Sequence, residues 1–152
     1  MRMSDFVVRE SMSAELGATT KEGVIREMVE NLRRAGYFKA SEPDEIVKAI
    51  LKREQLGSTG IGRGVAIPHT KHPSVDRLIG TVGVSHAGVT FESLDGEPVH
   101  VFVMLISPQD RPSDHLRALE NVSRCLRDDS FVRSLKHATT RDSIWNLLDD
   151  QA

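Results

Sequence analysis

The chain has 152 residues, of which 39% are hydrophobic and 28% charged, and its formal net charge is −2 at pH 7. This balance gives no general attraction for nucleic acid or anionic lipid, and no apolar run approaches the roughly 20 residues that span a bilayer. The lone Cys125 excludes an internal disulfide and is typical of a reducing compartment. We therefore expect a single cytoplasmic domain over residues 1–152, with its core between about residues 5 and 150, that neither binds nucleic acid nor inserts into a membrane.

Two helices are predicted in the first third of the chain. The first begins at Thr19, where Thr19-Thr20-Lys21-Glu22 matches a capping box, and it closes at Ala35-Gly36. The second begins after Ser41 and ends before Gly57. Apolar residues recur at helical spacing in both segments: Val24, Ile25, Met28, Val29 and Leu32 in the first, and Ile46, Val47, Ile50 and Leu51 in the second.

The middle third has the composition of a sheet. Residues 78–85 are small or β-branched and carry no helical stripe, Val89-Thr90-Phe91 is a short candidate strand, and Asp95-Gly96 is a turn signal. Residues 99–106 are apolar except for His100, which predicts a central strand that is covered on both faces. His100 itself is expected to be a core or sheet-end histidine.

The last third returns to helix. Ser113 can cap a helix that carries Leu116, Leu119, Val122 and Leu126, and shorter helices are predicted around residues 131–135 and 144–148. Helices before and after a sheet within one short chain predict a three-layer α/β domain.

A glycine-rich run leads to the most informative residue, His69. Gly60, Gly62 and Gly64 alternate along the run, residues 65–67 form an apolar triplet typical of a short buried strand, and Pro68 ends that strand. His69 is thereby delivered at a rigid strand end, which is where chemistry commonly lies.

The loop before this strand has two open interpretations. Walker A and dinucleotide-binding patterns are both absent, but the loop is rich in backbone donors and flanked by Arg53, Ser58, Thr59 and Arg63. It is suited to holding a small oxyanion, with Ser58, Thr59 and Gly60 as the predicted phosphate-binding loop. A tight structural turn without a ligand explains the glycines equally well.

Two further histidines need separate treatment. His72 lies three residues after His69, but Pro68 and Pro73 bracket the two histidines, and no other metal-ligand motif accompanies them. We therefore expect neither a metal nor a cofactor. His72 is expected to be exposed to solvent. His115 lies in the first turn of the helix predicted from Ser113, where the helix dipole favours a neutral imidazole. From position alone, His115 could also be an ordinary surface histidine.

Together these residues resemble a known family. The combination of Arg53-Glu54, the glycine run with Pro68-His69, and His115 at a helix start is similar to the IIA component of the bacterial phosphoenolpyruvate-dependent phosphotransferase system, of the fructose/mannitol type. The resemblance runs from about Thr19 to Leu148 and is strongest to the stand-alone nitrogen-regulatory branch.

The resemblance implies a three-layer α/β fold with a mixed sheet flanked by helices. It further implies that His69 is the phosphorylated nucleophile, that Arg53 binds the phosphoryl oxygens, and that His115 donates a hydrogen bond to them. Thr70, where many members carry glycine, and His72-Pro73 depart from the family pattern and could alter partner choice.

The implied activity is that of a phosphocarrier, a phosphotransferase that works through a phosphohistidine. The expected phosphoryl donor is an HPr-type carrier protein. Downstream, either a IIB protein receives the group on a cysteine, or the phosphorylation state regulates a transporter, a kinase or another enzyme. A regulatory or anion-binding α/β module, for which partner contacts matter more than phosphoryl transfer, is the remaining alternative.

Overall fold

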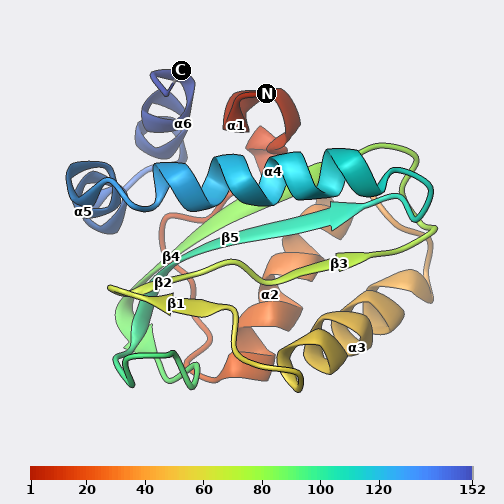
Figure 1. The fold of residues 1–152 in the computed structure, drawn as a ribbon, viewed down its shortest axis with the longest axis horizontal. Helices are drawn as coiled ribbons and strands as arrows, with labels where there is room; N and C mark the ends of the chain where they lie inside the picture. The colour runs from red at the N-terminus through yellow and green to blue at the C-terminus, as the bar shows by residue number, and fades with distance from the viewer. Residues whose placement is uncertain (152) are drawn as a thin grey trace.

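The computed structural model describes residues 1–151 and shows helices on both faces of one mixed sheet (Figure 1). The elements are α1 (Met3–Phe6), the 3₁₀ helix η1 (Arg9–Ser11), α2 (Lys21–Arg34), α3 (Glu42–Glu54), β1 (Gly60–Gly62), β2 (Val65–Ala66), β3 (His69–Lys71), β4 (Ile79–Val89), β5 (Val99–Ser107), α4 (Pro112–Cys125), α5 (Asp129–His137) and α6 (Arg141–Asp149). The predicted three-layer α/β class with a mixed sheet is confirmed.

The sheet is organised around β5. Both β2 and β3 pair with one edge of β5 in parallel, one after the other, and β4 pairs with its other edge in antiparallel orientation. β1 extends the sheet beyond β2 as an antiparallel neighbour. The long apolar run that predicted a central, doubly covered strand is therefore β5, as expected.

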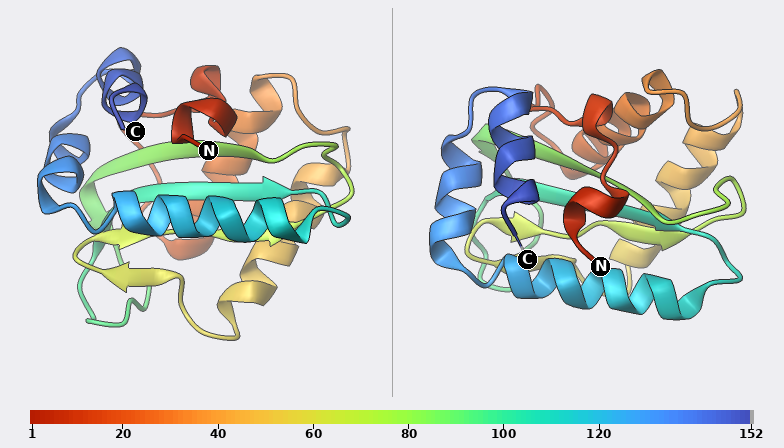
Figure 2. Two further views of the ribbon diagram at one scale, coloured as in Figure 1. Left: turned by 45° about the horizontal axis from the view of Figure 1, so that its top comes forward. Right: turned by 90° about the horizontal axis from the view of Figure 1, so that it is seen from above.

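Each face of the sheet has its own core, and the side chains of β5 alternate between them. Val101, Val103 and Leu105 pack with α1, α4, α5 and α6, whereas Phe102, Met104 and Ile106 pack with α2 and α3. Figure 2 shows α4 lying along one face of the sheet, with α2 and α3 on the opposite side. Every residue of β5 except the half-buried His100 is buried, and such burial requires the near-continuous apolar sequence seen here.

The predicted helix starts need correction. The side chain of Thr20, not Thr19, caps α2 by accepting from the Gly23 amide, so Glu22 is one residue too early to complete a capping box. The cap position of α4 is Arg111, with Pro112 as the first helical residue, and Ser113 lies inside the helix without a capping bond. Proline suits this first position because it has no N–H to leave unpaired.

The buried face of α4 also differs from the predicted stripe. Leu116 is 66% exposed, whereas His115, Ala118, Val122 and Cys125 face the interior. A histidine thus occupies a position on the buried face where the apolar pattern placed the neighbouring leucine. This one-residue shift brings His115 to the sheet.

Candidate functional site

Strand register places His69 on the α4 side of the sheet. β3 pairs in parallel with β5, and the partners are His69 with Leu105, Thr70 with Ile106, and Lys71 with Ser107. Residues side by side on paired strands point to the same face, and Leu105 belongs to the core beneath α4. His69 and Lys71 therefore share the face of the sheet that α4 covers.

The two histidines that the sequence singled out meet at this point. The ring centroids of His69 and His115 are 5.4 Å apart and the rings are inclined at 54°. A phosphoryl group attached to one ring can reach the other ring at this separation. From its position in the sequence, His115 could also have been a surface residue. In the structure it is only 5% exposed, whereas His69 is half-buried.

The hydrogen bond of His69 determines which ring nitrogen can react. Its Nδ1 lies 2.8 Å from the carbonyl oxygen of Ile67. Because a carbonyl only accepts, Nδ1 carries the proton, and Nε2 keeps a free lone pair. His69 is thus held in the tautomer that leaves the lone pair of Nε2 free to react.

His115 is held in a complementary way. Its Nδ1 is hydrogen-bonded to the hydroxyl of Ser107, the last residue of β5. When that hydroxyl donates, the imidazole proton sits on Nε2 and can be donated to a phosphoryl oxygen. Sequence reasoning overlooked Ser107, although a polar residue at the end of an apolar strand was a visible signal.

Both imidazoles are biased towards the neutral form. Burial lowers the pKa of His69, and the nearby Arg53 charge lowers it further, while the Ile67 hydrogen bond and the Glu54 charge act in the opposite direction. Burial lowers the pKa of His115 to about 4, with smaller contributions from the charges of His69 and Lys71. The neutral state expected for His115 therefore has burial as its largest cause.

Arg53 lies at the end of α3, close enough for its charge to influence His69. Its Nη1 donates to the carbonyl of Gly57 at 2.9 Å, and the side chain is half-buried. One such bond uses only part of a guanidinium's five donors. Lys71, on the same face as His69, adds a second cation that the sequence analysis did not identify.

The predicted phosphate-binding loop is occupied by internal hydrogen bonds. The Ser58 hydroxyl donates to the Phe91 carbonyl and accepts from the Gly60 amide, and both the amide and the hydroxyl of Thr59 donate to Glu54. These donors would have to exchange partners in order to bind an anion. That Ser58, Thr59 and Gly60 bind a phosphoryl group stays a prediction.

Two other side chains lie elsewhere than expected. Arg63, suggested by sequence as a flank of the oxyanion loop, donates instead to the Leu126 and Arg127 carbonyls at the end of α4 and pairs with Asp129. His72 is not solvent-exposed, since its side chain is 13% exposed and bonded to Ser74. Among residues 1–151, no group of three or more possible metal ligands is found.

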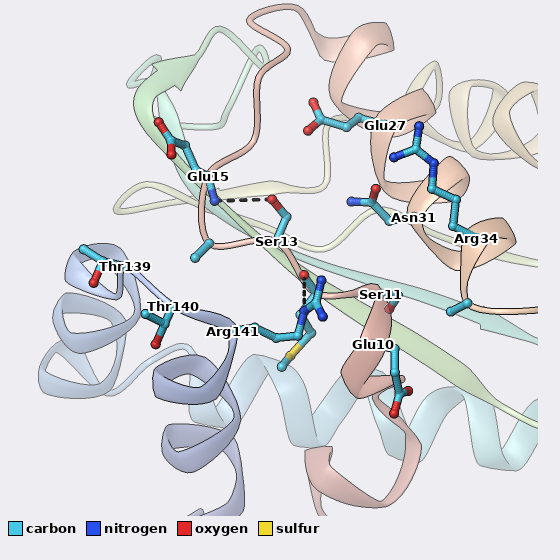
Figure 3. A pocket seen from close by; sticks show the side chains of 13 residues that line it. Glu10, Ser11, Ser13, Glu15, Glu27, Asn31, Arg34, Thr139, Thr140 and Arg141 are labelled. Carbon is cyan, nitrogen blue, oxygen red and sulfur yellow. Dashed lines mark hydrogen bonds between the residues drawn. The ribbon is translucent and has the colours of Figure 1, made fainter.

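A separate hollow of about 480 Å³ lies between the N-terminal segment, α2 and the start of α6 (Figure 3). Two of its charged side chains already bond within the chain: Arg141 donates to the Met12 carbonyl, and Glu27 accepts from the Gly17 and Ala18 amides. None of the predicted site residues is among those that line it. The hollow is therefore separate from the histidine pair.

Comparison with known proteins agrees with this geometry. Residues 6–151 match the family model described as the phosphoenolpyruvate-dependent sugar phosphotransferase system, EIIA 2. The chain belongs to this family. The resemblance inferred from the sequence is confirmed. Separately, none of the helices in residues 1–151 is long and apolar enough to cross a membrane.

Individual relatives come from both branches of the family. A nitrogen regulatory protein of Bradyrhizobium diazoefficiens is 30% identical over 97% of this chain and 95% of its own length. The fructose-specific EIIABC component of Bacillus subtilis is 35% identical over 97% of this chain, but the match covers only 23% of that longer protein.

Solved structures lead to the same family. The nitrogen regulatory protein IIA-Ntr of Neisseria meningitidis superposes with a TM-score of 0.86 at 25% identity, over 96% of this chain and 98% of that one. The mannitol IIA enzyme of Escherichia coli, in its complex with phosphorylated mannitol IIB, gives a TM-score of 0.77 at 26% identity over 93% of this chain and 96% of that one.

Proposed function

We propose that this protein is a phosphocarrier that accepts a phosphoryl group on Nε2 of His69 from the phosphohistidine of an HPr-type carrier protein. The observation that carries the proposal is the Ile67 hydrogen bond, which requires the proton on Nδ1 and leaves the Nε2 lone pair without a hydrogen-bond partner among residues 1–151. A neutral imidazole in a fixed tautomer is the nucleophile that this reaction needs.

The transfer itself exchanges one nitrogen–phosphorus bond for another. The Nε2 lone pair of His69 forms the new bond while the bond to the donor histidine breaks, and the electron pair leaves with the donor ring. Negative charge is spread over the three equatorial oxygens as the group moves. Arg53 and the Nε2–H of His115 are proposed to bind those oxygens, with Lys71 adding positive charge on the same face.

The family supports a phosphocarrier or a regulatory role, and we propose regulation as the purpose of the phosphorylation. The nitrogen regulatory relative matches along 95% of its own length, whereas the fructose-specific relative carries parts that this chain does not match. In this proposal, phosphorylation adds close to two negative charges beside Arg53 and Lys71 and thereby changes which partner surface the site accepts.

The nucleophile is tested by incubating the chain with phosphoenolpyruvate, enzyme I and an HPr-type carrier. We expect the mass gain of one phosphoryl group on the wild-type protein, as an acid-labile, alkali-stable phosphate. His69→Ala should abolish it, whereas His72→Ala, the matched control from the next loop, should keep it. Phosphorylation of His69→Ala at the normal rate would disprove the assignment.

Regulation and sugar relay are separated by a second incubation. The phosphorylated protein is mixed with a IIB protein whose cysteine can receive the group. Retention of the phosphate on His69 supports regulation, whereas rapid transfer to the IIB cysteine identifies a relay.

A further inference from the structure

A buried ion pair lies at the end of α3, close enough to His69 for the charge of Glu54 to act on the pKa of that imidazole. The Glu54 side chain is 3% exposed, and its Oε1 lies 2.9 Å from Nζ of Lys21, at the start of α2. Lys21 also stands over the ring of Phe91, 4.7 Å from its centroid. A carboxylate is rarely buried so completely unless it has partners, because desolvation of the charge is costly.

The second partner of Glu54 is Thr59. Oε1 accepts from the Thr59 amide at 3.1 Å, and Oε2 accepts from the Thr59 hydroxyl. Together with Lys21, these bonds connect α2 and α3 to the residue that precedes β1. The carboxylate thus accepts from three donors, of which two belong to Thr59 and hold that residue in place.

From Thr59, two more hydrogen bonds reach His69. The Thr59 carbonyl accepts from the Ile67 amide at 3.1 Å, and the Ile67 carbonyl accepts from Nδ1 of His69 at 2.8 Å. Pro68 follows directly, and its own carbonyl accepts from the Leu105 amide at 3.0 Å. The acceptor that sets the tautomer is therefore anchored on one side by β5 and on the other by Thr59.

From this chain of bonds we infer that Glu54 is a positioning residue, whose carboxylate oxygens act through Thr59 and Ile67 to hold His69 with its proton on Nδ1. The inference rests on the proposed function, because the tautomer matters only if Nε2 is the nucleophile. Glu54 never touches the phosphoryl group in this scheme. Its place resembles that of any buried carboxylate that orients a catalytic imidazole, with two backbone segments interposed.

The experiment compares two variants of the intact chain by ¹⁵N NMR of the His69 ring and by the rate of phosphorylation from an HPr-type carrier. Glu54→Ala removes the acceptor for Thr59. We expect a mixture of His69 tautomers in place of the single Nδ1–H form, and a phosphorylation rate lower by about 10-fold or more. The matched control, Glu22→Ala, removes an exposed carboxylate that is next to Lys21 in the first turn of α2, and it should leave both unchanged.

The double variant Lys21→Met/Glu54→Gln separates hydrogen bonding from charge. Glutamine keeps an oxygen for Thr59, and methionine removes the cation that would otherwise face an amide. In this double variant the His69 ring should have the wild-type tautomer, and the phosphorylation rate should lie within about 3-fold of the wild-type rate, since the acceptor for Thr59 is retained. A tautomer mixture in this variant, or a folded Glu54→Ala with wild-type tautomer and rate, overturns the inference.

If Glu54→Ala does not fold, Glu54→Asp decides the matter, because it keeps the charge and withdraws the oxygens from Thr59. An unchanged His69 tautomer and rate in Glu54→Asp overturns the inference. The tautomer is read without any phosphoryl donor. A failure of the proposed function, seen as a wild-type protein that is not phosphorylated, is therefore distinguishable from a failure of the inference.

Discussion

Burial of His115 predicts a specific loss of stability in acid. The pKa of this imidazole is about 4 in the folded protein, against an ordinary value of 6.5, because the ring is buried beneath α4 and faces the charges of His69 and Lys71. The folded pKa is the lower one, so the unfolded chain binds more protons between these values. The free energy of unfolding therefore falls as the pH falls through this window.

The magnitude follows from the two pKa values. At pH 5 the unfolded imidazole is about 97% protonated and the folded one about 10%, which corresponds to a destabilisation of about 2 kcal/mol relative to pH 7.5. His115→Gln keeps a hydrogen-bonding side chain but does not titrate. Its loss between pH 7.5 and pH 5 should be smaller than that of the wild type by this amount, because the other groups titrate in both proteins.

Urea unfolding of both proteins at pH 7.5 and pH 5 measures the difference, and an NMR titration of the His115 ring measures its pKa directly. Equal acid losses in the two proteins would refute the argument. So would a His115 titration midpoint near 6.5, because it would mean that the ring is hydrated and free to charge.

Two substitutions of arginine should separate the site from the scaffold. Arg53→Ala should slow phosphorylation by about 100-fold, the typical effect of losing one transition-state donor. Arg53→Lys should recover only part of the rate, because an ammonium lacks the paired donors of a guanidinium. Full activity in Arg53→Ala would show that Arg53 is not part of the site. Arg63→Ala should lower the free energy of unfolding by about 1–3 kcal/mol, measured in urea, because two carbonyls at the end of α4 lose their donor. Its phosphorylation rate should stay at the wild-type level, and a slow but fully stable Arg63→Ala would instead place this arginine in the site.

The sequence predicted those parts of the fold in which local pattern and burial agree. α3 begins after Ser41 and ends before Gly57 as expected, and the apolar run 99–106 is the central strand β5. Helix starts were less certain because several residues near Thr20 and Ser113 can cap a helix, and only tertiary contacts select among them. Leu116 was wrongly placed on the buried face of α4 for a related reason: hydrophobicity alone does not reveal which face of the helix packs against the sheet.

The two histidines of the candidate site could be singled out from the sequence, but the way in which they meet could not. Pro68 at a strand end singled out His69, and a predicted helix start singled out His115. The distance of 5.4 Å between their ring centroids, however, depends on how α4 packs over β5. The partners of the two Nδ1 atoms, Ile67 and Ser107, depend on the same packing. No local pattern contains such information, because it arises between segments far apart in the chain.

The glycine run contributes through geometry more than through its amides. Gly62 and Gly64 have φ angles of 96° and 79°, in the region that side chains disfavour, and they turn the chain from β1 into β2. The Gly64 carbonyl accepts from the amides of His100 and Val101, which fixes where β2 starts along β5. From that start, the chain enters β3 with His69 opposite Leu105.

This register has only two outcomes for the nucleophile, because side chains alternate between the faces of a strand. With His69 opposite Leu105, the imidazole lies beneath α4 beside His115. A slip of one residue would turn it towards α2 and α3 and the apolar core that they cover, away from His115 and Ser107. The glycines therefore matter to the site because the turn that they form determines the register of β3, and this register decides to which face of the sheet His69 points. This accounts for a glycine-rich loop beside the proposed phosphoryl-transfer site, even though the hydroxyls of that loop already bond within the chain.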